Sequence, residues 1–315
     1  MDEFALIEQY FDWYSSQPNV EVGLGDDAAI VQLGNEARVA LSTDTFVEGV
    51  HFPAGFNPEH LGWRLAATNL SDQAAMGASP RFATLNLTLQ SVDEDWLAAF
   101  SVGLRSGLEC YDCVLVGGDT TAGPLTLSLQ IVGEVNNAPL KRGGASAGDR
   151  VFVSGTLGDA AGALAEFNQS GEFNSGSDLY PRFSMPTPRV ALGKALCGVA
   201  SAAIDISDGL IADLEHLASA SGVGIEIAIP RLPLSAALLQ KFSSSRAQEL
   251  AATGGDDYEL AFTAAAHHEQ TVFDIANDNG VGVTMIGRVV AGSGVISTDA
   301  AGDPAAFARS GHRHF

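Results

Sequence analysis

The apolar residues of this chain follow helical spacing in some stretches and strand-like alternation in others. Helical spacing predicts helices over residues 2–16, 58–77, 93–109, 158–167, 210–220 and 266–278, with one more beginning near residue 189. Apolar runs and alternation predict strands over residues 28–33, 38–42, 82–89, 114–116, 125–135, 151–153, 202–206, 223–229, 258–263 and 282–290. Strands and helices therefore mix along the whole chain, with antiparallel and crossover connections both expected.

The 315 residues suffice for about two domains. The best boundary is the stretch from Asn136 to Asp149, which holds one proline and three glycines. We therefore expect an N-terminal domain over residues 1–138 and a C-terminal domain over residues 139–315. Residues 168–186, rich in Ser, Gly, Asn and Pro, are expected to form a mobile loop.

The charge is strongly acidic: 16 basic residues stand against 38 acidic ones, for a net charge of −22. Nucleic acid and anionic membrane surfaces are therefore unlikely partners, because both need a basic footprint. No apolar run reaches the length of a membrane span, and the acidic N-terminus does not resemble a signal peptide. Three cysteines do not suit a disulfide framework. A cytoplasmic protein is expected.

Acidic residues recur in one setting, next to Gly, Ser or Thr and mostly at the end of an apolar strand, where residues 42–45 and 117–121 are expected to form turns after short strands, the one at 114–116 buried. Five sites share this feature: Asp26/Asp27, Asp44, Asp72 (near a helix end), Asp119 and Asp205/Asp208. A single Asp of this kind is more often a helix cap or a turn residue. All five together favour a centre in which cations neutralise converging carboxylates, and Mg²⁺ held against phosphate fits best.

The nucleotide-binding signals are weaker. Gly117-Gly118-Asp119 offers exposed backbone and one carboxylate, whereas P-loop, Rossmann and protein-kinase signatures are absent from the sequence. Arg142 is a candidate phosphate clamp, with a solvated linker charge as an equal alternative. His51 is a candidate substrate contact, with an ordinary surface histidine as the alternative. No arrangement for a covalent nucleophile is evident.

Taken together, the motifs resemble those of the thiamine-monophosphate kinase family, within the superfamily of aminoimidazole-ribonucleotide synthetase-like ATP enzymes. The resemblance covers nearly the whole chain, in order. Its motifs are Gly25-Asp-Asp-Ala28, Ser42-Thr-Asp-Thr45, Glu48-Gly-Val-His51-Phe52, Asn69-Leu-Ser-Asp72, Gly117-Gly-Asp-Thr-Thr121, Asp205-Ile-Ser-Asp-Gly209 and Gly254-Gly-Asp-Asp-Tyr-Glu-Leu260.

The resemblance implies an α/β fold of the α+β type with two domains, the PurM-like fold. The N-terminal domain would have a mixed sheet with helices, and two chains would form a homodimer through these sheets. The C-terminal domain would be α/β, and the active site would lie in the cleft between the two domains. It implies ATP-dependent phosphorylation of thiamine monophosphate to thiamine diphosphate, with several Mg²⁺ ions and ATP as co-substrate. A requirement for a monovalent cation stays open.

Site residues follow by position from the resemblance. The implied Mg²⁺ ligands are Asp27, Ser42, Thr43, Asp44, Asp72, Asp119, Asp205 and Asp208. The implied ATP contacts are Gly118, Asp119, Arg142 and Ser207, and the implied thiamine monophosphate contacts are His51, Asp256 and His312. The family usually has Glu in place of Asp256 and an aromatic residue in place of His312.

The expected mechanism is direct in-line transfer without a phosphoenzyme, since the acceptor is already a phosphate oxygen. Two alternatives remain at this point. One is another ATP enzyme of the superfamily, such as an amidine-forming cyclase of the purine pathway. The other is a divalent-metal-binding protein without catalysis.

Overall fold

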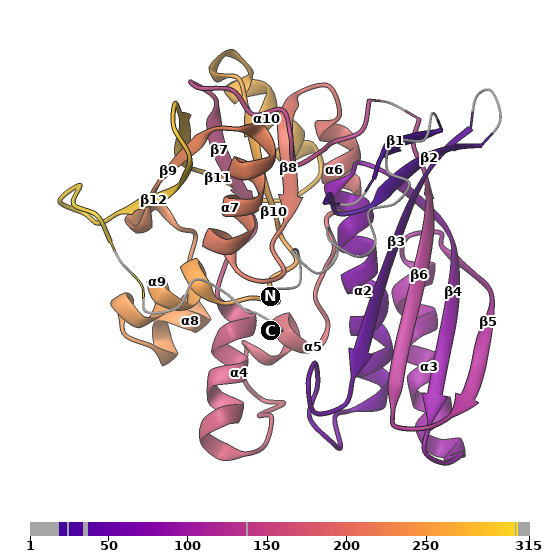
Figure 1. Cartoon of the computed structure of the whole chain (residues 1–315). Helices are drawn as coiled ribbons and strands as arrows, with labels where there is room; N and C mark the ends of the chain where they lie inside the picture. The colour runs from indigo at the N-terminus through magenta and orange to yellow at the C-terminus, as the bar shows by residue number, and fades with distance from the viewer. Residues whose placement is uncertain (1–18, 24, 34–36, 137, 306, 308–315) are drawn as a thin grey trace.

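The computed structural model describes residues 19–23, 25–33, 37–136, 138–305 and 307. Within these residues the chain forms two six-stranded sheets, each with helices packed against it (Figure 1). The first sheet ends with residue 134 and the second begins with residue 150, so the predicted boundary falls in the connection between them. The helix expected over residues 2–16 lies outside the described residues.

The N-terminal sheet has the strand order β1-β2-β3-β6-β4-β5. Its strands are β1 (Val20–Val22), β2 (Ala29–Leu33), β3 (Ala37–Val47), β4 (Ser79–Leu89), β5 (Val114–Ala122) and β6 (Thr126–Glu134). Neighbours pair antiparallel except β4 and β5, which are parallel. That pair needs a crossover, and helix α3 (Glu94–Glu109) supplies it.

Helix α2 (Pro58–Ala75) lies between this sheet and the C-terminal domain, and most of its residues are buried. Pro58 occupies the first turn, and the Asn57 side chain caps the helix by accepting from the His60 amide at 3.1 Å. Gly103 lets α3 pack closely, because a Cβ there would lie 1.7 Å from the Glu59 carbonyl oxygen. The helix predicted over residues 58–77 is confirmed.

Two motifs expected to be turns lie inside strands. Ser42 to Thr45 falls within β3, and Gly117 to Thr121 falls within β5. The short buried strand predicted at residues 114–116 is wrong in both respects, because β5 has nine residues and all of them are exposed. In β3, residues 39–47 pair with β6, whereas β2 pairs only with residues 37–41. The pairing with β6 therefore extends the strand through residues that favour turns in isolation.

The C-terminal sheet has the order β12-β9-β11-β7-β10-β8. Its strands are β7 (Arg150–Ser154), β8 (Ala200–Asp205), β9 (Gly224–Ala228), β10 (Leu260–Ala264), β11 (Val283–Val290) and β12 (Gly294–Thr298). The helical segments are α4 (Asp159–Ser170), α5 (Tyr180–Ser184), α6 (Val190–Leu196), α7 (Leu210–Ser221), η1 (Ile229–Arg231), α8 (Ala236–Lys241), α9 (Ser244–Thr253), η2 (Ala266–His268) and α10 (Glu269–Asp278).

Strands β7 and β10 of this second sheet are buried on both faces. Phe152 and Phe262 point to the face that Phe273 of α10 covers, whereas Val151 and Val153 belong to the opposite cluster with Leu214 of α7. Buried strands of this kind read as continuous apolar runs, which is why they were predictable. The helices α8 and α9 and the strand β12 were not predicted.

Residues 168–186 are more ordered than expected. They contain the end of α4 and the whole of α5, and Phe173 stacks on Phe183 with ring centroids 4.9 Å apart. Phe56 of the N-terminal domain packs on the edge of both rings. The segment therefore contributes to the contact between the domains. None of the helices in the described part of the chain has the length and apolar character that crossing a bilayer requires.

Candidate active site

Three carboxylates from different parts of the fold meet between the two domains. Asp27 precedes β2, Asp72 lies in the last turn of α2, and Asp205 is the final residue of β8. Each offers an oxygen atom, and these atoms all lie within 4.8 Å of one another. Oxygen ligands at such spacing from separate elements suit a hard divalent cation such as Mg²⁺.

Arg142, from the connection between the domains, is paired with this group. Its Nη2 donates to Asp27 Oδ1 at 2.6 Å, and its backbone amide donates to Asp26 at 3.2 Å. The Asp27 side chain is 1% exposed, and its other oxygen, Oδ2, is buried without a hydrogen-bond partner among the described residues. Arg142 thus belongs to the acidic centre and is not a solvated linker charge.

The carboxylates of the centre repel one another and are buried, which disfavours their ionised forms. Burial and the Asp27 charge raise the pKa of Asp205 to about 8. Burial and then the charges of Asp44, Asp205 and Asp27 raise the pKa of Asp72 well above its ordinary range. Because Arg142 is a single positive charge, it offsets only part of this repulsion. A bound divalent cation would stabilise the ionised carboxylates, so the residues present fit Mg²⁺.

Strand β3 adds Ser42 and Asp44 on its face toward α2. The Ser42 hydroxyl accepts from Gln73 Nε2 at 2.9 Å, and the Asp44 amide donates to Asn69 Oδ1 at 3.0 Å. Burial raises the pKa of Asp44 to about 6. Thr43 is exposed and, by strand alternation, projects from the opposite face of the sheet, so its side chain does not face this centre.

Asp119 and Gly118 do not join the three-carboxylate group within one chain. The pairing register places Asp119 in one cross-strand row with Asn86, Ser128 and Thr45. Asp44 stands in the adjacent row and therefore on the other face. Three strand spacings separate the two residues, or roughly 14 Å.

Ser207 and Asp208 lie in the turn between β8 and α7. Asp213, one turn into α7, holds this turn by accepting from the amides of Ser207, Asp208 and Gly209 at 3.0–3.2 Å. Burial, followed by the charges of Asp205 and Asp208, raises the pKa of Asp213 well above its ordinary range. Asp213 was missed from sequence because one acid in an amphipathic helix carries no distinguishing signal.

His51 and Asp256 are linked through Phe46 and Arg64: His51 stacks on Phe46, and Arg64, which lies near the Phe46 ring, is paired with Asp256. His51 Nδ1 accepts from the Val47 amide at 3.0 Å, and its ring stacks on Phe46 at 5.7 Å. Asp256 has a left-handed backbone with φ of 71° and accepts from Arg64 Nη2 at 2.6 Å. His312, the third predicted substrate contact, lies outside the described residues.

Comparison with known proteins identifies the family of this chain. The family models for the N-terminal and C-terminal domains of AIR synthase related protein match residues 25–135 and 146–299. The thiamine-monophosphate kinase of Salmonella typhimurium is 43% identical over 99% of this chain and 98% of its own length. That of Escherichia coli K12 is 42% identical over the same shares. This chain belongs to the thiamine-monophosphate kinase family.

Solved structures of the family share the fold. The thiamine-monophosphate kinase of Stenotrophomonas maltophilia K279a is 41% identical with a TM-score of 0.82, over 96% of this chain and 98% of that one. AaThiL complexed with AMPPCP and TMP is 34% identical with a TM-score of 0.86, over 100% and 97%. Hydrogenase maturation protein HypE, at 19% identity and a TM-score of 0.76, shares the fold alone. The predicted family and the two-domain α+β fold are confirmed.

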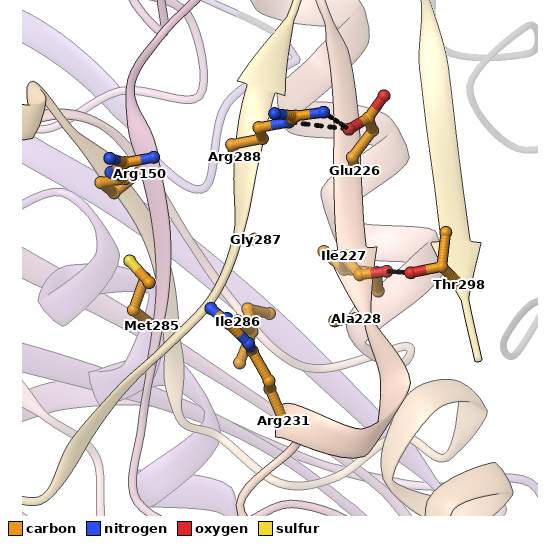
Figure 2. A pocket seen from close by; sticks show the side chains of 10 residues that line it. All are labelled: Arg150, Glu226, Ile227, Ala228, Arg231, Met285, Ile286, Gly287, Arg288 and Thr298. Carbon is orange, nitrogen blue, oxygen red and sulfur yellow. Dashed lines mark hydrogen bonds and ion pairs between the residues drawn. The ribbon is translucent and has the colours of Figure 1, made fainter. Parts of the chain in front are cut away.

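A hollow lies on the C-terminal sheet (Figure 2). Residues of β7, β9, η1, β11 and β12 line it, and none of these elements carries Asp27, Asp72 or Asp205. It has a volume of about 190 Å³ and is lined by Arg150, Arg231 and Arg288 among others. Arg288 is already paired with Glu226 at 2.7 Å, and Arg150 lies 3.7 Å from Glu269. The carboxylate that lines this hollow, Glu226, is paired with Arg288, so the clustered carboxylates between the domains are the better candidate for metal-assisted phosphate chemistry.

Proposed function

We propose that this chain transfers the γ-phosphoryl group of ATP to thiamine monophosphate and so produces thiamine diphosphate. The observation that carries the proposal is the meeting of Asp27, Asp72 and Asp205 between the two domains of a thiamine-monophosphate kinase fold. Two phosphate anions repel each other, and an acidic protein can bring them together only through cations. The clustered carboxylates are suited to holding those cations.

The residues that would hold Mg²⁺ are Asp27, Asp44, Asp72 and Asp205, with support from Ser42 and Asp208. The bound ions would screen the phosphates and stabilise the charge that develops on the leaving ADP. The buried, unpartnered Oδ2 of Asp27 is an acceptor of the kind that such an ion would satisfy. The carboxylates act as ligands and not as nucleophiles.

The remaining predicted residues act on the organic and phosphate parts of the substrates. Arg142 is proposed to contact ATP from its place beside Asp27, and Ser207 from the start of α7. His51 and Asp256 are proposed to face thiamine monophosphate. No general base is required, because the acceptor phosphate oxygen is already an anion at neutral pH. The transfer is therefore direct.

We further propose that the working unit is a homodimer in which the second copy supplies Gly118 and Asp119. Strand β5 is an edge strand with every residue exposed, and Val114, Leu115 and Val116 are each at least 45% exposed. An exposed apolar edge suits contact with a partner. We propose that in this dimer one chain's Asp119 serves the same site as the other chain's Asp44.

We also place the protein in the cytoplasm. Free Cys110, Cys113 and Cys197 are compatible with a reducing compartment. ATP, the proposed co-substrate, is made and used there.

A coupled assay for ADP tests the proposal. We expect turnover with thiamine monophosphate and Mg²⁺, and only background ADP with free thiamine or after chelation with EDTA. Equal turnover with free thiamine contradicts the acceptor assignment. Metal binding without any turnover would leave the chain as a non-catalytic metal-binding protein.

A further inference from the structure

Arg64 is a buried cation on helix α2, whose other buried residues are mostly apolar. Its side chain is 3% exposed and points across the contact between the domains. Its Nη1 donates to the Phe183 carbonyl oxygen at 2.5 Å, and its Nη2 donates to Asp256 Oδ1 at 2.6 Å. A buried guanidinium needs such a partner, since an unpaired charge in this environment is strongly destabilising.

Asp256 is held from two directions on the same oxygen. Besides Arg64, the Tyr258 hydroxyl donates to Oδ1 at 3.1 Å. The hydrogen bonds to this carboxylate from described residues both end on Oδ1. The Asp256 side chain is 28% exposed, so Oδ2 remains available to a ligand. The backbone is also anchored, because the Asp256 amide donates to the Ser207 carbonyl oxygen at 2.8 Å.

Aromatic rings surround this ion pair. The guanidinium carbon of Arg64 lies 4.1 Å from the centre of the Phe183 ring and 5.8 Å from those of Phe46 and Tyr258. Phe46 in turn stacks on His51. A part-exposed carboxylate oxygen next to this aromatic cluster suits a flat, amino-bearing ring, because the carboxylate accepts hydrogen bonds and the apolar surroundings suit the ring. Thiamine monophosphate has this chemistry in its aminopyrimidine ring.

We propose that Arg64 is a positioning residue for the acceptor substrate. It holds Asp256 so that Oδ2 accepts a hydrogen bond from the amino group of the aminopyrimidine ring. The inference rests on the proposed function and adds to it a cation that acts through Asp256 without touching the substrate. Arg64 comes from the N-terminal domain and Asp256 from the C-terminal domain, so the pair also couples the acceptor site to the way the domains meet.

Steady-state kinetics of Arg64→Met, Arg64→Lys, Asp256→Asn and the double variant Arg64→Met/Asp256→Asn test this role. For Arg64→Met we expect KM for thiamine monophosphate to rise by roughly ten- to a hundredfold, as loss of a charge-assisted hydrogen bond implies. KM for ATP should stay within about twofold of the wild-type value, because the pair is proposed to act on binding of the acceptor and not of ATP. The double variant should have the acceptor KM of Asp256→Asn alone, since Arg64 acts through Asp256.

Arg64→Lys keeps the charge but has no planar fork, so it cannot bond Phe183 and Asp256 in the same way. We expect an intermediate acceptor KM from this variant, which also provides the test should Arg64→Met fail to fold. Arg105→Met, at a side chain 78% exposed on α3, is the matched control and should change neither KM. Equal rises in both KM values, or effects of Arg64 and Asp256 that multiply, overturn the proposal. Failure of the wild-type protein to use thiamine monophosphate at all would instead overturn the proposed function.

Discussion

Asp44 and Asp119 lie on opposite faces of the N-terminal sheet, with strands β6 and β4 between their own strands. Neither side chain can reach the other's face within one chain. If both serve one active site, a second copy of the chain must supply one of them. On the proposal that both residues serve one site, activity therefore requires the homodimer.

Mixed dimers of Asp44→Asn and Asp119→Asn chains test the shared site. Each variant alone should be nearly inactive. A purified mixed dimer contains one site with both wild-type residues, so we expect about half the turnover of the wild-type dimer. The measurement is ADP formation by dimers co-expressed with two different affinity tags. Mixed dimers as inactive as their parents would show that the site is not assembled from two chains in this way.

Asp44→Asn should abolish most activity while leaving the fold intact. The substitution keeps the hydrogen bond from the Asp44 amide to Asn69 but removes a proposed metal ligand. We expect turnover to fall by at least about a hundredfold, because charge stabilisation by the ion is weakened. Thermal unfolding in EDTA should occur at the same or a higher temperature, since a buried carboxylate with a raised pKa has been neutralised. Asp274→Asn, on the exposed face of α10, is the control.

Mg²⁺ should stabilise the protein more as the pH rises. The pKa values of Asp44 and Asp205 are raised from 3.8 to about 6 and about 8, both chiefly by burial. Without metal, each of these two carboxyl groups binds more protons in the folded state than in the unfolded state at pH values between 3.8 and its raised pKa. The contribution of these two groups to stability is therefore fully present below their unfolded value of 3.8 and is lost as the pH rises toward about 8. Mg²⁺ needs the ionised oxygens, so its contribution has the opposite trend.

The measurement is the difference in melting temperature with and without Mg²⁺ from pH 5.5 to 8.5. We expect this difference to grow across the range, with Ca²⁺ as a comparison ion. A difference that is constant or shrinks with pH contradicts a site made of these carboxylates.

Much of the site was predictable because its residues carry a local signal. Asp27, Asp44, Asp72 and Asp205 each stand beside small or hydroxyl residues in an apolar context, which a metal site explains better than solvation does. Arg64 carries a similar signal, a cation on an apolar helix, but its partner Asp256 lies 192 residues away in sequence. Only the fold shows that pairing.

The turns predicted near the site were also wrong because the local sequence does not show which strands pair. Gly, Ser, Thr and Asp favour turns when judged locally, so residues 42–45 and 117–121 were predicted to be turns. In the structure residues 42–45 of β3 pair with β6, and the Asp44 amide also donates to Asn69 of α2, so these partners satisfy backbone groups that a turn would otherwise satisfy. The consequence for function is large, because strand alternation is what sends Asp44 and Asp119 to opposite faces.

Glu259 should be among the most important charged residues for stability. Its side chain is fully buried and accepts from Ser154 Oγ at 2.5 Å, Arg182 Nη2 at 2.7 Å and Arg189 Nε at 2.6 Å. Removing the carboxylate leaves two arginines without their partner, so Glu259→Ala should lower the free energy of unfolding by about 3–5 kcal/mol. Glu226→Ala breaks the exposed pair with Arg288 and should lower it by no more than about 1 kcal/mol. Urea unfolding followed by tryptophan fluorescence compares the two variants, and similar losses would mean that burial does not set the strength of these pairs.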